Sequence, residues 1–208
     1  MKNNIPIEEW IKPIKEMNRL RNIKLKHSID INKKSIIFNF TIINRKLVWT
    51  RGSSNRTKDN KRIFYIDYDN MKESFVKEEL LMLQERYCLG DILIFQSSEN
   101  GFHGVSFAKL SLGEFVDILN NSSCDYAFKN MPHYLKFSRY WILRNFDKGS
   151  KKKPKYLYTL TSKTDRKQSF AHWKYFNILY PDSKINQLTN SDGLEDITIV
   201  DYPTGTNI

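Results

Sequence analysis

The stretch Lys61–Asn70, KRIFYIDYDN, decides the interpretation of the chain because a short apolar run ends there in Asp67 and Asp69. Its apolar and aromatic residues favour a buried strand, in which side chains alternate between two faces. The two carboxylates therefore share one face, with Cα atoms about 7 Å apart at ideal strand rise. Such a pair is costly to bury without a positive charge between them. Mg²⁺ or Mn²⁺ would supply that charge, and a solvated turn is the alternative.

The bulk composition indicates a folded intracellular protein with a polyanionic partner. The 208 residues suit one domain with a real core, and 40% of them are hydrophobic. No apolar run approaches the length of a membrane span, and the N-terminal residues lack the apolar segment of a signal peptide. The net charge of +11 favours nucleic acid, although the Lys, Asn and Ile bias of an AT-rich genome is an alternative explanation. Cys88 and Cys124 lack zinc-ligand spacing and are expected to be reduced core residues.

The order of predicted elements after the acidic strand indicates the fold class. Hydrophobic periodicity predicts a helix over 73–87, strands over 92–97 and 102–108, a helix over 112–120 and a strand over 124–128. With the strand before the acids, the order is strand, helix, strand, strand, helix, strand. This is the split βαβ order of ferredoxin-like and RNA-recognition-motif (RRM) folds, in which the first and third strands are central neighbours. We therefore expect an α+β chain with an RRM-like core over residues 61–146.

Two extensions flank this core within one expected domain, 1–208. Residues 1–60 form an N-terminal α/β extension, with a helix over 6–22 and a hairpin of strands 35–43 and 46–50. Residues 147–208 form a basic C-terminal β/α segment. Its expected elements, including the strand that leads into it, are strands over 136–146, 156–161 and 196–202 and a helix over 170–180. Between residues 147 and 167, eight basic residues stand against two acidic ones, and nearby aromatics suit a strand of nucleic acid.

Fold topology gives a histidine and a third acid a place beside the first two acids. His103 lies in the predicted third strand and Asp125 in the predicted fourth. Because the first and third strands are neighbours in a split βαβ sheet, His103 can face Asp67 and Asp69 across one open surface. A lone strand histidine is more often structural, but this placement beside paired acids favours a functional role.

Three motifs in this order resemble the archaeo-eukaryotic primase superfamily, which includes primase small subunits and plasmid and viral primase-polymerases. The hhhDxD strand corresponds to Ile63–Asp69, the S-x-x-G-x-H turn and strand to Ser98–His103, and the hydrophobic-acid pair to Cys124-Asp125. The resemblance covers residues 62–146. It implies a template-dependent nucleotidyltransferase, a DNA primase or primase-polymerase, that acts by two-metal phosphoryl transfer.

The resemblance also implies a role for each motif residue. Asp67, Asp69 and Asp125 would be catalytic and would hold Mg²⁺ or Mn²⁺, which activate the 3′-hydroxyl and neutralise the triphosphate. His103 would contact phosphates of the incoming NTP or dNTP beside the turn of Ser98 and Gly101. Arg139 or Arg144 would add positive charge toward the triphosphate.

The basic segment would grip the single-stranded DNA template without reading its sequence. The residues expected to do so are Lys151, Lys152, Lys153, Lys155, Lys163 and Arg166. The chain shows no zinc-binding segment and has no room for an attached helicase. We therefore expect either an enzyme that relies on a separate helicase or replication protein or a minimal enzyme of the mobile-element type. No membrane partner is expected.

Three other functions remain open from the residues. A metal-dependent nuclease uses the same clustered carboxylates. A replication-initiator endonuclease would carry an H-x-H string, which this chain lacks. A non-catalytic RRM-like nucleic-acid-binding module would display aromatics on its central strands, whereas aspartates there would repel a phosphate chain.

Overall fold

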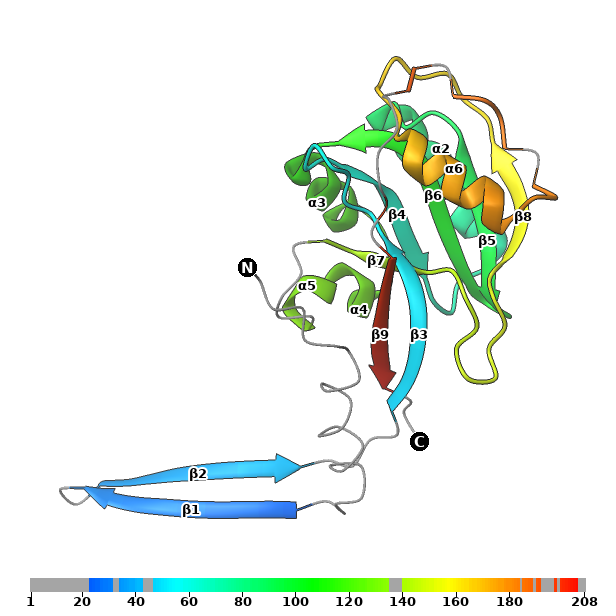
Figure 1. Ribbon diagram of the computed structural model, residues 1–208. Helices are drawn as coiled ribbons and strands as arrows, with labels where there is room; N and C mark the ends of the chain where they lie inside the picture. The colour runs from blue at the N-terminus through cyan, green and yellow to red at the C-terminus, as the bar shows by residue number, and fades with distance from the viewer. Residues whose placement is uncertain are drawn as a thin grey trace, which may run out of the picture. The chain divides into compact units, whose positions relative to one another are not determined.

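The computed structural model describes residues 23–31, 34–42, 47–134, 140–183, 185–188, 190–191, 197 and 199–205 (Figure 1). The chain divides into two compact units, Met1–Val48 with Pro203–Ile208 and Trp49–Tyr202. Among the described residues, no helix has both the length and the apolar character needed to cross a membrane. The helix predicted over 6–22 lies outside the described residues.

The first unit contains a two-stranded antiparallel ribbon. Strand β1 (Ile23–Ile31) pairs along its whole length with β2 (Lys34–Ile42). The hairpin predicted between strands 35–43 and 46–50 is therefore wrong, because β3 (Leu47–Ser54) pairs in another sheet. Apolar and polar residues alternate through Ile23–Ile31, and this is the strand signal that the prediction overlooked.

The second unit is built on a four-stranded antiparallel sheet in the order β4-β6-β5-β8. Its strands are β4 (Arg62–Tyr68), β6 (Gly101–Leu110), β5 (Ile92–Ser98) and β8 (Lys155–Leu160). The first and third predicted strands, β4 and β6, are hydrogen-bonded neighbours as expected, but β4 lies at the edge of this sheet and not at its centre. The α+β fold class is confirmed.

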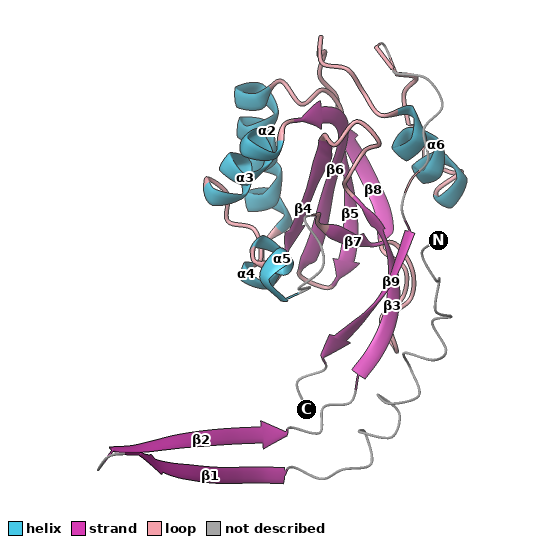
Figure 2. Cartoon of the chain, turned by 60° about the vertical axis from the view of Figure 1, so that its left-hand side comes forward, coloured by secondary structure: helices cyan, strands magenta, loops and turns pink. Residues whose placement is uncertain are grey.

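Helices cover both faces of this sheet (Figure 2). Helices α2 (Glu73–Tyr87) and α3 (Leu112–Asn120), both predicted, lie on one face. Helix α2 packs closely on the sheet at Gly104 of β6. A Cβ at this position would lie 2.8 Å from Ile66 of β4 and 3.2 Å from Leu80 of α2. Helix α6 (Phe170–Leu179) packs on the other face, where its Phe176 ring lies 6.2 Å from Tyr65. The surface that the sequence prediction treated as open is therefore partly covered.

A smaller sheet and two short helices surround the outer edge of β4. The sheet has the order β7-β3-β9, with β7 (Ile142–Arg144) and β9 (Ile199–Gly205). The strand predicted over 124–128 is wrong, because these residues enter α4 (Tyr126–Lys129), which α5 (Met131–Tyr134) follows. Asp125 caps α4 by accepting the Phe128 N–H at 2.8 Å, and aspartate is a preferred N-cap residue.

The remaining predictions agree in part. The strand predicted over 136–146 is described as a strand only at Ile142–Arg144, and residues 135–139 lie outside the described part. Both cysteines are free thiols, but only Cys124 is buried. Cys88 follows α2 as its left-handed C-cap at φ 50° and is exposed, so the core assignment is wrong for it.

Candidate active site

The antiparallel register of β4 and β6 sets Asp67 directly opposite His103. The Nε2 atom of His103 lies 3.3 Å from Oδ1 of Asp67. The His103 side chain is 4% exposed and the Asp67 side chain 25% exposed. Both side chains lie on the same face as Tyr65, because strand residues alternate. The predicted meeting of the first acid with the histidine is therefore present in the structure.

The pKa shifts of this pair favour the neutral form of both groups near pH 7. Burial, together with the charges of Asp69 and Asp125, raises the pKa of Asp67 to about 8 against the opposing effects of Arg144 and Lys151. Burial and the Arg144 charge lower the pKa of His103 to about 3. Oδ1 of Asp67 is buried without a hydrogen bond, because the close His103 nitrogen is not aligned to donate to it. The contact is therefore not an ion pair.

Asp69 lies against the turn that joins β5 to β6. Ser98 pairs with Gly101 across this turn. A Cβ on Gly101 would collide with the Ser98 hydroxyl and would lie 2.8 Å from Ser97 Oγ and 3.2 Å from Asp69 Oδ1. The backbone holds the two segments together, since the Met71 N–H donates to the Asn100 carbonyl at 2.9 Å. The glycine of the turn therefore makes room for the exposed Asp69 carboxylate.

Asp125 lies beside Asp67 through a backbone contact and not, as predicted, on a neighbouring strand of the sheet. The backbone N–H of Asp125 donates to the carbonyl of Asp67 at 2.7 Å, which places the residue along the outer edge of β4. Its Oδ2 atom caps α4. The negative charge of Asp125 nevertheless contributes to the raised pKa of Asp67. The structure thus places Asp125 beside Asp67 through a backbone contact, on a helix cap instead of a strand, and the three carboxylates do not form one metal-binding group.

Arg144 is the predicted cation that the structure places at this site. It is 8% exposed, and its charge lowers the pKa values of both Asp67 and His103. Its guanidinium donates to three backbone carbonyls, at 2.8 Å to Ser97, 3.0 Å to Phe146 and 2.8 Å to Lys152. The positive charge of Arg144 therefore affects the pKa values of Asp67 and His103. Its hydrogen bonds tie the end of β5 to the loop that follows β7. Arg139 lies outside the described residues.

Lys148, the first lysine of the basic run expected to grip the template, also lies near the acids. Lys148 and Lys151 exchange backbone hydrogen bonds of 2.8 and 3.0 Å in a tight loop after β7. Burial and neighbouring cations lower the pKa of Lys148, whereas Asp69 and Asp67 raise it. The loop therefore carries two lysines to the side of the sheet where the acids lie.

The six basic residues predicted to bind template are divided between the two ends of β8. Lys151, Lys152 and Lys155 lie toward the acids, since Lys155 pairs with Gln96 near the β5–β6 turn. Lys163 and Arg166 follow the far end of the strand.

Two of the six make contacts that hold the fold. The Nζ atom of Lys153 donates to the Leu179 carbonyl at 2.5 Å and lies 4.2 Å from the Tyr180 ring centroid. Arg166 pairs with Glu114 at 2.8 Å. The six residues therefore do not form one continuous basic surface.

The carboxylates are the groups that fit a divalent cation. Asp67 offers a buried oxygen without a hydrogen bond, and Asp69 is exposed beside it. Carboxylate oxygens are the ligands that Mg²⁺ and Mn²⁺ prefer. As the described side chains stand, no three His, Cys, Asp or Glu groups are close enough to hold a metal ion together. The fit is therefore to Asp67 and Asp69, with Asp125 already capping α4.

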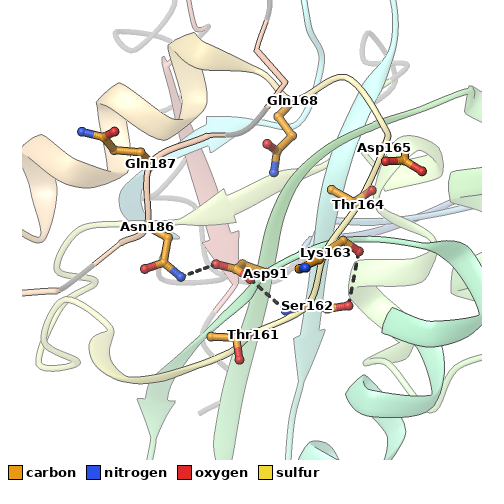
Figure 3. Close-up of a pocket in the computed structure, with 9 residues that line it drawn as sticks. All are labelled: Asp91, Thr161, Ser162, Lys163, Thr164, Asp165, Gln168, Asn186 and Gln187. Carbon is orange, nitrogen blue, oxygen red and sulfur yellow. Dashed lines mark hydrogen bonds between the residues drawn. The ribbon is translucent and has the colours of Figure 1, made fainter.

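A separate polar pocket of about 620 Å³ lies at the opposite end of β5 (Figure 3). It is lined by Asp91, Thr161, Ser162, Lys163, Thr164, Asp165, Gln168, Asn186 and Gln187. Asp91 accepts the Ser162 N–H at 2.9 Å and the Asn186 amide at 2.7 Å. Because the carboxylate at its centre already has partners within the pocket, we place the candidate site at the acids.

One further residue near the acids was missed by the sequence prediction. Glu79 is a buried carboxylate on α2, 9% exposed. It falls on the apolar stripe of that helix with Val76, Leu80 and Leu83, all fully buried. An acid on the apolar stripe of a helix indicates a specific role in the sequence itself, because a buried carboxylate requires hydrogen-bond partners.

Comparisons with family models, curated proteins and solved structures found no match to this chain. The functional hypothesis therefore rests on the residues: Asp67 opposite His103, Asp69 at the turn and Asp125 bonded to β4.

Proposed function

We propose that this chain is a template-dependent nucleotidyltransferase of the primase-polymerase kind, with an RRM-like catalytic core. The observation that carries the proposal is the β4–β6 register, which sets the first acid of the D-x-D pair opposite the motif histidine. Asp69 against the glycine turn and Asp125 bonded to the Asp67 carbonyl support it. These contacts bring together residues that lie up to 58 positions apart in the sequence.

In this proposal, the acids and the surrounding cations have complementary roles. Asp67 and Asp69 hold divalent ions, which when bound supply charge to activate the attacking 3′-hydroxyl and to stabilise the pyrophosphate. Neutral His103 can donate an N–H to a phosphate oxygen without first gaining a proton. Lys148 and Lys151 add positive charge beside the acids, while Arg144 keeps the turn and the loop in place.

The position of α6 determines how a substrate approaches. Its Phe176 packs on Tyr65 and, at a ring distance of 5.6 Å, on Phe95, so the central part of this face is filled. A nucleotide would therefore enter at the end of the sheet, between the β5–β6 turn and the loop of Lys148 and Lys151. The same packing argues against a passive RRM-like module, because such modules stack bases on aromatics of exposed central strands.

The proposal is tested by incubating the protein with single-stranded DNA, labelled NTPs or dNTPs, and Mn²⁺ or Mg²⁺. We expect labelled strands from the wild type and none from Asp67→Asn or Asp69→Asn. Asp91→Asn is the matched control, because it changes an acid at the far end of β5 and should keep the activity. Cleaved template would favour a nuclease, and salt-sensitive binding without chemistry would favour a binding module. Either result would refute the proposal.

A further inference from the structure

The buried carboxylate of Glu79 joins two segments that carry the acids. Its Oε1 atom accepts the Tyr68 hydroxyl at 2.8 Å and the Ser123 N–H at 2.9 Å. Both bonds lie on the α2 face of the sheet, opposite the face of Asp67, because Tyr68 and Asp67 are consecutive strand residues. Glu79 is thus close to the acids in the structure without being available to a substrate at their face.

The two partners of Glu79 are neighbours of the acids in the sequence. Tyr68 stands between Asp67 and Asp69, and Ser123 precedes Asp125 by two residues. The Asp125 N–H then returns to the Asp67 carbonyl at 2.7 Å. A closed circuit of hydrogen bonds therefore runs from β4 through Glu79 to the segment before α4 and back to β4.

We propose that Glu79 is a positioning residue that fixes Asp125 relative to the Asp67 and Asp69 pair. This inference rests on the proposed function, since it assigns a purpose to the placement of the third acid. The residues around Asp125 are held on one side by the α4 cap and on the other by the Glu79 contact. Without Glu79, the Ser123 N–H loses its partner and the segment can move away from β4.

Gln84 supplies a matched control on the same helix. It is 4% exposed, and its amide donates to the Gly90 carbonyl at 2.6 Å and the Leu160 carbonyl at 2.9 Å. Like Glu79, it uses one buried atom to bond two segments to α2. It does so at the start of β5 and the end of β8, far from the acids. The Gln84→Ala substitution therefore measures the stability lost when α2 loses two such hydrogen bonds at a position away from the acids.

The test compares Glu79→Ala, Glu79→Gln and Gln84→Ala by amide hydrogen exchange, thermal unfolding and nucleotide incorporation. We expect both alanine variants to unfold at lower temperature. Only Glu79→Ala should speed exchange of the Asp125 amide, by about ten-fold or more for one lost hydrogen bond. It should also lower kcat about ten-fold or more with little change in the nucleotide KM, because displacing a group from its reacting geometry reduces rate. Glu79→Gln keeps an acceptor oxygen and should behave like the wild type.

Several outcomes would overturn the inference. One is that the Asp125 amide exchanges no faster in Glu79→Ala than in Gln84→Ala. Another is that the two variants lose kcat equally. A Glu79→Gln variant as impaired as Glu79→Ala would show that charge and not position matters. Should Glu79→Ala not fold, Glu79→Met provides the same loss of the acceptor at similar length. An inactive wild type would refute the proposed function, while the exchange measurement would still decide whether Glu79 holds Asp125.

Discussion

Replacing Asp67 by asparagine is expected to stabilise the protein while removing its proposed activity. Asp67 is held at a partly buried position beside Asp69 and Asp125, and its Oδ1 atom lacks a hydrogen bond. Asparagine has nearly the same shape and cannot ionise. The substitution therefore removes an electrostatic cost from the native state and leaves the packing of β4 against β6 intact.

The size of the effect follows from the pKa of Asp67, which is about 8 in the native state against 3.8 for the free group. Between these values the native state holds a proton that the unfolded chain has released, so stability falls as pH rises. Four units at 1.36 kcal/mol each would give an upper limit of about 6 kcal/mol. Because a quarter of the side chain is exposed, solvent screening reduces this limit, and we expect at least about 2 kcal/mol at pH 8, or a Tm increase of at least about 4–8 °C.

The assay is thermal unfolding of the wild type and Asp67→Asn from pH 4.5 to pH 9 in buffer with a chelator. The Tm difference should be small near pH 4.5 and should grow until about pH 8. Asp91→Asn is the control, because its carboxylate accepts two hydrogen bonds and asparagine cannot accept both with the same geometry. That variant should be destabilised, the opposite sign from Asp67→Asn.

A less stable Asp67→Asn variant across the whole pH range would refute this reasoning. It would mean that Asp67 contributes to stability as the partner of His103 or Arg144, and that its carboxylate is a structural group. A stabilised variant with a Tm difference independent of pH would show that packing, and not ionisation of Asp67, is responsible.

Three further results are expected, two at the acids and the neighbouring turn and one at the N-terminal cap of α3. Mn²⁺ at about 100 times its dissociation constant should stabilise the wild type at pH 8 by about 3 kcal/mol and leave the Tm of Asp67→Asn unchanged. Gly101→Ala should lower the free energy of unfolding by about 1–3 kcal/mol and reduce nucleotide incorporation, because the added Cβ meets the Ser98 and Ser97 hydroxyls. Chemical unfolding and the labelled-nucleotide assay measure the two effects. Glu114→Gln should cost about 0.5–1 kcal/mol at pH 7, allowing for solvent screening. Because Ser111 and Arg166 lower the pKa of Glu114 to about 2, that difference should vanish in acid unfolding as pH falls from 4.5 toward 2.

The core strands and helices could be predicted because their signals are local. The helix over Glu73–Tyr87 has the predicted bounds, and the register that joins Asp67 to His103 follows from the neighbouring first and third strands. The partner of β2 was not predicted, because the alternation of apolar and polar residues through Ile23–Ile31 was not recognised as a strand. The 124–128 segment was assigned as a strand although its aspartate is a favourable helix cap.

Charge along the sequence is the signal that carried least information about the site. Lys153 and Arg166 belong to the basic run, but one bonds the end of α6 and the other pairs with Glu114. Which lysines remain exposed toward a partner depends on tertiary contacts that no run of charges encodes. Lys148, in contrast, acquires its place beside the acids from a tight backbone loop with Lys151.

The electrostatic cost at Asp67 adds to the β4–β6 register as an argument for a functional site at this end of the sheet. A strand residue opposite His103 could be apolar, and the same β4–β6 pairing would then carry no buried ionisable group. Instead, the chain gathers Asp69 and Asp125 near Asp67 and raises its pKa. It also brings Arg144 and Lys151 close enough to oppose that effect. Alternating charges at a partly exposed strand end are expected where a cation and a phosphate group must bind together, since each then neutralises charges that the protein alone leaves in conflict.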